Sequence, residues 1–234
     1  MELSQINSAI VGLCQDVEDS IKSRMWSDMS EKELIHELVL CILGSGVRYE
    51  IAASYSNAIS KNGCLIKKNV KEPDHIIKSI LSILNNQVDS LWNDKCYKRY
   101  RYPNIRATYI SESYCNIVNE FGSMKSFLNK SGPATKLRRK LVQICPGIGP
   151  KQASHFLKNV GYSDELAILD RHIIKYMEMS NNNIEINYQL GSLDKYEHIE
   201  SIYIKAVSKF NYPVAIVDQA MWFVMRAVGR EAMI

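Results

Sequence analysis

The sequence predicts an all-α fold, and three observations support this prediction. Apolar residues recur with helical spacing along most of the 234-residue chain, glycine and proline separate these stretches, and alternating strand patterns are nearly absent. Hydrophobic residues make up 46% of the chain, which is enough to form a sizeable core. We therefore expect one compact helical array.

The length of the chain allows either one large domain or two small ones. We expect a single unit over residues 1–234. If this unit divides, we expect one helical lobe over about residues 30–125 and a second lobe formed by residues 1–29 and 126–234, which contains the hairpin described below.

The first half of the chain contains a segment that we expect to be its central helix. Residues 30–43 open with Ser30 and Glu33, a capping-box pattern, and their apolar stripe is too wide for a surface helix. The N-terminal residues are amphipathic and carry acids where a signal peptide needs bases, so we expect a helix there. Proline or glycine bounds the other expected helices: residues 51–60, 74–85, 103–122 and 124–129.

The second half continues the same helical pattern. An amphipathic helix is expected over residues 134–144, followed by a tight turn and a helix over residues 151–160 that Gly161 closes. Asp170 lies where an N-cap belongs. After it we expect helices over residues 171–178, 196–210 and 213–228, a polar loop over residues 181–194, and Gly229 just beyond the last helix.

Charge and cysteine content limit the classes of function. The net charge is +4, and basic residues alternate with tyrosines in residues 95–106 (KCYKRYRYPNIR), a composition that suits a phosphate backbone or a solvated helix face. The six cysteines form no CxxC pair, which indicates reduced cysteines and neither disulfides nor a zinc site. No apolar run is long enough to span a bilayer, so we expect no membrane partner, and the reduced cysteines lead us to expect a cytoplasmic protein.

The turn at residues 145–156 (CPGIGPKQASHF) is the most informative stretch of the sequence. Two glycines between two amphipathic helices predict a helix-hairpin-helix, because glycine permits a tight turn and close backbone approach. The amides of such a turn, with a helix N-terminus behind them, form an anion site that suits a nucleic-acid phosphate. An ordinary corner between two helices is the alternative.

Lys151 and Asp170 add a chemical element to this turn. They are nineteen positions apart, with one helix and a short return between them, so the two side chains can come together. Partial desolvation at a helix N-terminus disfavours the charged ammonium form of an amine. The neutral amine is a nucleophile that can form a Schiff base. The alternative is that Lys151 contacts phosphate as a charge and Asp170 is only a helix cap.

Residues 144–172 (ICPGIGPKQASHFLKNVGYSDELAILDRH) resemble the catalytic core of the helix-hairpin-helix DNA glycosylase superfamily. The segment is most similar to the archaeal-type 8-oxoguanine DNA glycosylase/AP lyase family. Residues 37–50 resemble the central helix and wedge loop of that superfamily, residues 100–110 the segment against the DNA, and residues 218–222 the helix beside the base pocket. The resemblance implies a helical glycosylase fold with a DNA-binding cleft.

The resemblance also implies roles for individual residues. Lys151 matches the lysine that attacks C1′ and expels the base, and Asp170 matches the essential carboxylate. The resemblance implies phosphate binding by three hairpin residues and by one histidine: Gly147, Ile148, Gly149 and His172.

The wedge departs from the family pattern, and the roles of the base-pocket candidates remain open. Gly46 stands where relatives place a side chain that fills the gap of the flipped base, so Arg48, Val47 or Arg106 is expected to serve instead. Asp218 and Trp222 lie four apart on one helix face, and they either contact the flipped base or belong to the core.

The implied cofactor and partners complete the hypothesis. The iron–sulfur branch of the superfamily has four cysteines after the aspartate, and this chain has none there, so no cluster, other cofactor or metal is expected. A monovalent ion at residues 146–149 stays open. The expected partner is duplex DNA with a damaged base, and the protein is expected to be a nucleoid-associated monomer.

Three functions follow as hypotheses. The first is a bifunctional DNA glycosylase/AP lyase that excises an oxidised purine, 8-oxoguanine, through a Lys151 Schiff base and β-elimination. The second keeps this chemistry but acts on another damaged or modified base, such as an oxidised pyrimidine. The third is a non-catalytic helix-hairpin-helix module that only binds DNA.

Overall fold

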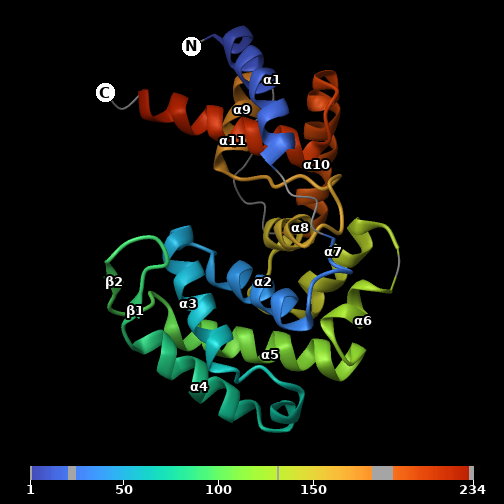
Figure 1. Cartoon of the computed structure of the whole chain (residues 1–234). Helices are drawn as coiled ribbons and strands as arrows, with labels where there is room; N and C mark the ends of the chain where they lie inside the picture. Colours follow the sequence, from blue (N-terminus) through green and yellow to red (C-terminus); the bar gives the residue numbers. More distant parts are fainter. Residues whose placement is uncertain (1, 21–24, 131, 181–191, 232–234) are drawn as a thin grey trace. The chain divides into compact units, whose positions relative to one another are not determined.

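A computed structural model describes residues 2–20, 25–130, 132–180 and 192–231. It confirms the predicted helical fold. The chain divides into two compact units, shown in Figure 1: a middle unit, residues 25–148, and a terminal unit, residues 1–24 with 149–234. Each unit has its own hydrophobic core and is described separately below.

The middle unit is built around a buried helix, α2. Eight of its thirteen residues are buried, and α3, α5 and α6 pack on it. Ser30 and Glu33 form the predicted capping box at its start. The elements of this unit are α2 (Glu31–Leu43), α3 (Tyr49–Asn62), the 3₁₀ helix η1 (Lys67–Lys71), α4 (Pro73–Asn85), β1 (Val88–Asp89), β2 (Cys96–Tyr97), α5 (Pro103–Phe121), α6 (Met124–Leu128) and α7 (Ala134–Ile144).

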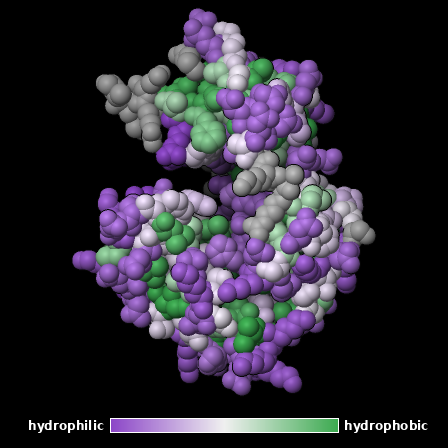
Figure 2. Space-filling view, in the orientation of Figure 1, coloured by the Kyte–Doolittle hydropathy of each residue, from purple (hydrophilic) through white to green (hydrophobic). Residues whose placement is uncertain are grey.

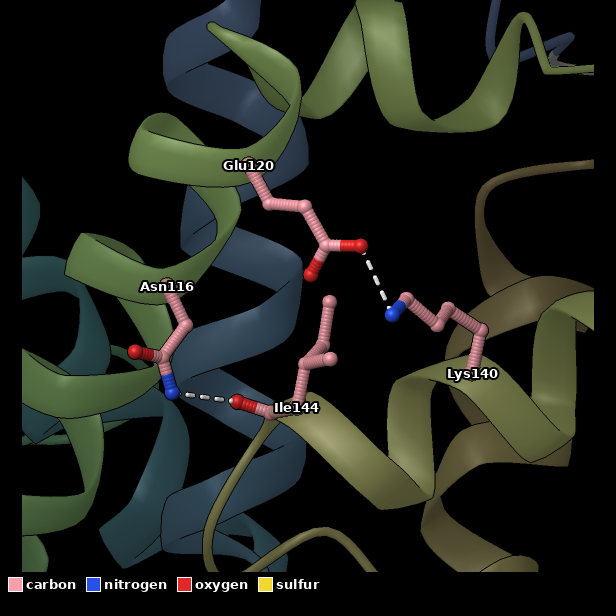
Figure 3. A network of polar contacts seen from close by, with 4 residues as sticks. All are labelled: Asn116, Glu120, Lys140 and Ile144. Atoms are coloured by element: carbon pink, nitrogen blue, oxygen red, sulfur yellow. Dashed lines mark hydrogen bonds and ion pairs between the residues drawn. The ribbon is translucent and has the colours of Figure 1, made fainter.

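One face of α5 holds the end of α7 in place. Residues 109, 113, 116 and 120 share this face at three- and four-residue spacing, and each contacts α7 or the turn after it. The contacts are Tyr109 against Gly147, Ser113 Oγ donating to the Pro146 carbonyl at 3.3 Å, Asn116 Nδ2 donating to the Ile144 carbonyl at 2.8 Å, and Lys140 Nζ lying 2.7 Å from Glu120 Oε1. Figure 3 shows the last two contacts. The start of the hairpin is therefore fixed by its own unit.

The terminal unit combines the first helix with the last four. Its elements are α1 (Leu3–Ser20), α8 (Pro150–Asn159), α9 (Arg171–Ser180), α10 (Leu193–Val207), the 3₁₀ helix η2 (Ser208–Phe210) and α11 (Val214–Glu231). α11 packs on both α1 and α9, and their apolar faces form the core of this unit. Gly161 takes a positive φ of 68° just after α8, as predicted for a glycine that closes a helix.

Three boundaries differ from the prediction. Gly229 lies inside α11, because one glycine costs only about 1 kcal/mol in a helix that is already packed. The polar loop predicted over residues 181–194 ends earlier, since Ser192 caps α10 and Leu193 begins it; residues 181–191 lie outside the described residues. The two units meet between Ile148 and Gly149 rather than at residue 125, because α6 packs on α2 and α5, and α7 packs on α5.

Two further features concern the apolar residues of the described helices. On the face shown in Figure 2, hydrophobic side chains gather on the terminal unit where α11 lies, and Phe223 of that helix is exposed. None of the described helices is both long and apolar enough to cross a bilayer.

Candidate active site

The hairpin between α7 and α8 uses its two glycines differently. Gly147 has a φ of 81°, and a Cβ there would lie 2.5 Å from Cδ2 of Tyr109, so glycine is required. The N–H of the buried Ile148 donates to the Cys145 carbonyl at 3.1 Å and closes the turn. Gly149 has an ordinary φ of −89°, and a Cβ there would meet open space. The backbone therefore needs glycine at position 147, whereas at Gly149 the missing side chain leaves room beside the first amides of α8.

This difference predicts unequal effects of alanine in the hairpin. Gly147→Ala should lower the free energy of unfolding by about 2–3 kcal/mol, because it combines a left-handed backbone with a clash against Tyr109. Gly149→Ala should cost about 1 kcal/mol or less, the cost of alanine at a helix N-cap. Urea unfolding of both variants checks this. Equal losses would contradict the different roles of the two glycines.

An extended segment, residues 167–169, leads directly to Asp170. Side chains of α10 and α11, rather than a neighbouring strand, accept its backbone N–H groups. The three bonds run from Ala167 to Glu200 Oε1 (2.9 Å), from Ile168 to Asp218 Oδ2 (2.7 Å) and from Leu169 to the Tyr196 hydroxyl (3.1 Å). Buried acceptors of this kind fix the segment, because an unpaired buried N–H is costly. Asp218, a candidate for the base pocket, therefore braces the approach to Asp170.

Asp170 is the predicted N-cap of α9. Its Oδ1 accepts the N–H groups of His172 at 2.8 Å and Ile173 at 3.0 Å. Within the described part of the chain, its Oδ2 makes no hydrogen bond. The carboxylate thus holds a fixed orientation with one oxygen and keeps the other available.

Lys151 lies in the first turn of α8 and is exposed. The expectation of a partly desolvated amine is therefore wrong for the protein without DNA, because the Lys151 side chain is exposed. His155 lies one turn later on the same face. Burial and the charges of Lys158 and Lys151 lower the pKa of His155 to about 4, while Asp170 raises it. Lys151, His155 and Asp170 therefore share one electrostatic environment, with a neutral imidazole at its centre.

Lys158 is the second lysine of this helix, and its role is structural. Its Nζ donates to the Ala215 carbonyl at 3.0 Å and lies 3.5 Å from Gln219 Oε1, both on α11. Burial lowers the pKa of Lys158, and Asp218 raises it. Lys158 therefore joins α8 to α11, whereas Lys151 has no hydrogen-bond partner among the described residues.

Two titratable groups of the terminal unit, His155 and Asp218, predict opposite effects of pH on stability. The pKa of His155 is lowered from 6.5 to about 4, so its contribution to stability is complete above pH 6.5 and is lost as the pH falls through 4. Burial raises the pKa of Asp218 to about 6, against the Tyr203 hydroxyl, the Ile168 N–H and Lys158, so its contribution is complete below pH 4 and is lost as the pH rises through 6.

On acidification from pH 7 to 4, His155→Gln should therefore lose less stability than the wild type, and Asp218→Asn should lose more. Urea unfolding at several pH values checks both variants. A wild-type slope in His155→Gln would show that this imidazole is not the group responsible.

His172, which follows Asp170 by two residues, contacts Trp222 of α11. The His172 ring stands edge-on to the half-buried Trp222 ring at 6.0 Å, and Arg226 Cζ lies 4.8 Å from the centre of the same indole. Arg171 Nε donates to His172 Nε2 at 3.3 Å. Burial lowers the pKa of His172, Asp170 raises it, and the neighbouring cations lower it further. Trp222 is thus a partly accessible aromatic side chain next to His172, whose backbone N–H donates to Asp170.

The wedge candidates lie in the middle unit. Gly46 has a φ of 75°, is exposed and has open space around it, and Arg48 is exposed at the start of α3. Arg106 Nη2 donates to the Ser45 carbonyl at 2.9 Å, and its guanidinium lies 5.9 Å from the Tyr109 ring. Arg106 therefore holds the loop after α2 in this structure, which leaves Arg48 as the more accessible cation.

Three residues of the site were missed at the level of sequence. His155, Tyr196 and Glu200 contribute to the surroundings of Lys151 and Asp170. Tyr196 and Glu200 are polar groups four residues apart on an apolar helix face, which is a signal for a buried hydrogen-bond role.

The arrangement in the terminal unit can perform nucleophilic chemistry. An exposed primary amine and an oriented carboxylate with one available oxygen influence the same imidazole. The amine can attack an electrophilic carbon, and the carboxylate can stabilise positive charge or move a proton.

Known proteins with similar sequences were identified by comparison. The family model described as 8-oxoguanine DNA glycosylase matches residues 17–212. An 8-oxoguanine DNA glycosylase/AP lyase of Metallosphaera sedula is 33% identical over 196 residues, covering 83% of this chain and 82% of the relative. A protein of the same name from Saccharolobus islandicus is 32% identical over 200 residues, covering 84% of each chain.

Solved structures with a similar fold were also found. The 8-oxoguanine DNA glycosylase of Methanocaldococcus jannaschii matches with a TM-score of 0.66 and 25% identity, covering 95% of this chain and 92% of that one. Its structure with a 15-mer DNA containing 8-oxoguanine matches with a TM-score of 0.67 and 24% identity, covering 94% and 96%. With a family model that matches most of its residues, this chain belongs to the 8-oxoguanine DNA glycosylase family.

Proposed function

We propose that this protein is a DNA glycosylase/AP lyase that excises 8-oxoguanine from duplex DNA. The observation that carries the proposal is the pair formed by Lys151, an exposed amine at the start of α8, and Asp170, whose Oδ1 is fixed by two cap bonds while Oδ2 stays available. Family membership supports the choice of base.

Lys151 Nζ, once deprotonated, attacks C1′ of the damaged nucleotide. The bond from C1′ to the base breaks as the bond to Nζ forms, and the base leaves with the electron pair and takes up a proton. Ring opening then gives a Schiff base between Lys151 and C1′. Loss of a C2′ proton breaks the C3′–O bond and releases the 3′ phosphate, which is β-elimination. Asp170 stabilises the positive charge that develops on the sugar.

The remaining candidates are assigned to binding. Gly147 and Gly149 offer backbone amides to a phosphate, Ile148 contributes by closing the turn that presents them, and His172 lies close to Asp170 for a second phosphate contact. Trp222 offers its accessible face or edge to the extruded base. Asp218 acts through its bond to Ile168.

The proposal includes no cofactor, because an amine and a carboxylate suffice for this chemistry. We place the protein in the cytoplasm on nucleoid DNA and expect it to act as a monomer. Its six cysteines are free, which is typical of a reducing compartment.

Borohydride trapping tests the proposal. The protein is mixed with a labelled duplex that contains 8-oxoguanine opposite cytosine, sodium borohydride is added, and a covalent complex is sought on a denaturing gel. We expect an adduct, because reduction makes the Schiff base permanent. An adduct with an abasic duplex alone would support the lyase activity and would show that the excised base is not 8-oxoguanine. No adduct with either duplex would favour a module that only binds DNA.

A further inference from the structure

Two aromatic side chains of the middle unit form an exposed pair. Trp92 and Tyr49 are 52% and 59% exposed, and their ring centroids lie 5.9 Å apart at an angle of 49°. Large aromatic side chains usually bury most of their surface, and exposed ones that lie together mark an interaction site. Trp92 and Tyr49 are therefore a candidate interaction site.

The loop that carries Trp92 is held in a defined position. It joins β1 to β2, which lie beside α3 in Figure 1, and α3 begins with Tyr49. The Leu91 N–H donates to Ser54 Oγ of α3 at 3.3 Å, and the Tyr55 hydroxyl, also on α3, donates to the Tyr97 carbonyl at 3.0 Å. The pair is therefore presented by anchored backbone.

The chemistry around the pair suits a nucleic acid. Residues 95–106 contain five basic and no acidic residues, and Arg48 directly precedes Tyr49. Aromatic faces stack on bases of any sequence, while neighbouring cations contact the phosphates. Asp94 and Glu50 are the acidic residues adjacent to the pair in sequence, so the charge next to the rings is mixed and the basic run extends away from them.

We propose that Tyr49 and Trp92 form a stacking platform for the base left unpaired on the strand opposite the damaged nucleotide. This inference rests on the proposed function, because extrusion of one base leaves its partner unpaired, and an unpaired base can leave the stack and present a face to aromatic side chains. Gly46, three residues before Tyr49, has no side chain to fill the resulting gap, and open space surrounds it. The two rings can supply the missing stacking surface.

Binding to a stable abasic duplex tests the inference without cleavage. One duplex carries a tetrahydrofuran abasic analogue opposite cytosine, and a second carries the analogue in both strands, so that no base is left to stack. Trp92→Ala should weaken binding to the first duplex about tenfold, the typical value of one stacked base. On the second duplex it should bind as tightly as the wild type. Trp92→Phe should retain most of the affinity for the first duplex.

Two results would overturn the inference. One is an equal affinity of Trp92→Ala and wild type for the first duplex. The other is the same loss of affinity on both duplexes, which would assign Trp92 to contacts with the DNA backbone. Ile66→Ala, which truncates another exposed apolar side chain of the same unit, is the control and should bind both duplexes normally. A wild-type protein that does not prefer the abasic duplex to intact DNA would instead count against the proposed function.

Discussion

Lys151→Gln should abolish the borohydride-trapped adduct and lower the strand-cleavage rate by about 1,000-fold or more, because glutamine cannot form a Schiff base. The melting temperature should stay close to that of the wild type, since Lys151 is exposed. DNA affinity should fall only modestly, since one phosphate-attracting charge among many is lost. Trapping, single-turnover cleavage and a binding titration of the same preparation check the three expectations together.

Lys158→Gln is the matched control, because both lysines lie on α8. In the wild type, Lys158 Nζ donates to the Ala215 carbonyl and lies close to Gln219. The substitution should therefore lower the free energy of unfolding by about 1–2 kcal/mol. The adduct should still form. If Lys158→Gln lost the adduct and Lys151→Gln kept it, Lys158 would be the nucleophile and the proposed role of Lys151 would be wrong.

The sequence predicted those parts of the fold that depend on local signals. Ser30 with Glu33 identified the start of α2, and the period of residues 134–144 gave both ends of α7, because caps and amphipathic faces are encoded within a few residues. The predicted family is confirmed by the match over residues 17–212. Asp170 was recognised as an N-cap from its position before residues 171–178, and its two bonds to the backbone confirm that role.

The unpredicted parts depend on tertiary contacts. Glu200, Tyr196 and Asp218 accept backbone N–H groups from a segment far away in the sequence, and no local pattern reveals that pairing. No local pattern predicts that Trp92 is exposed, because this depends on the way its loop is anchored to α3. The same limit applies to Arg106, whose bond to Ser45 links positions sixty-one residues apart.

Asp170→Asn should lower the excision rate by about 100-fold or more while leaving the free energy of unfolding within about 0.5 kcal/mol of the wild-type value. Asparagine is as good an N-cap as aspartate, and its Oδ1 can accept the same two N–H groups. It removes the negative charge that stabilises the developing positive charge on the sugar. Single-turnover excision of 8-oxoguanine and urea unfolding measure the two effects separately.

Asp170→Ala separates the cap from the chemistry. It should lower the excision rate at least as much as Asp170→Asn and should in addition cost about 1 kcal/mol of stability, because both cap bonds are lost. If Asp170→Asn kept the wild-type rate while Asp170→Ala lost it, the residue would act only by fixing the start of α9. A loss in both variants, with a stable Asp170→Asn, would assign the reaction to the carboxylate charge, for which the open Oδ2 is the available oxygen.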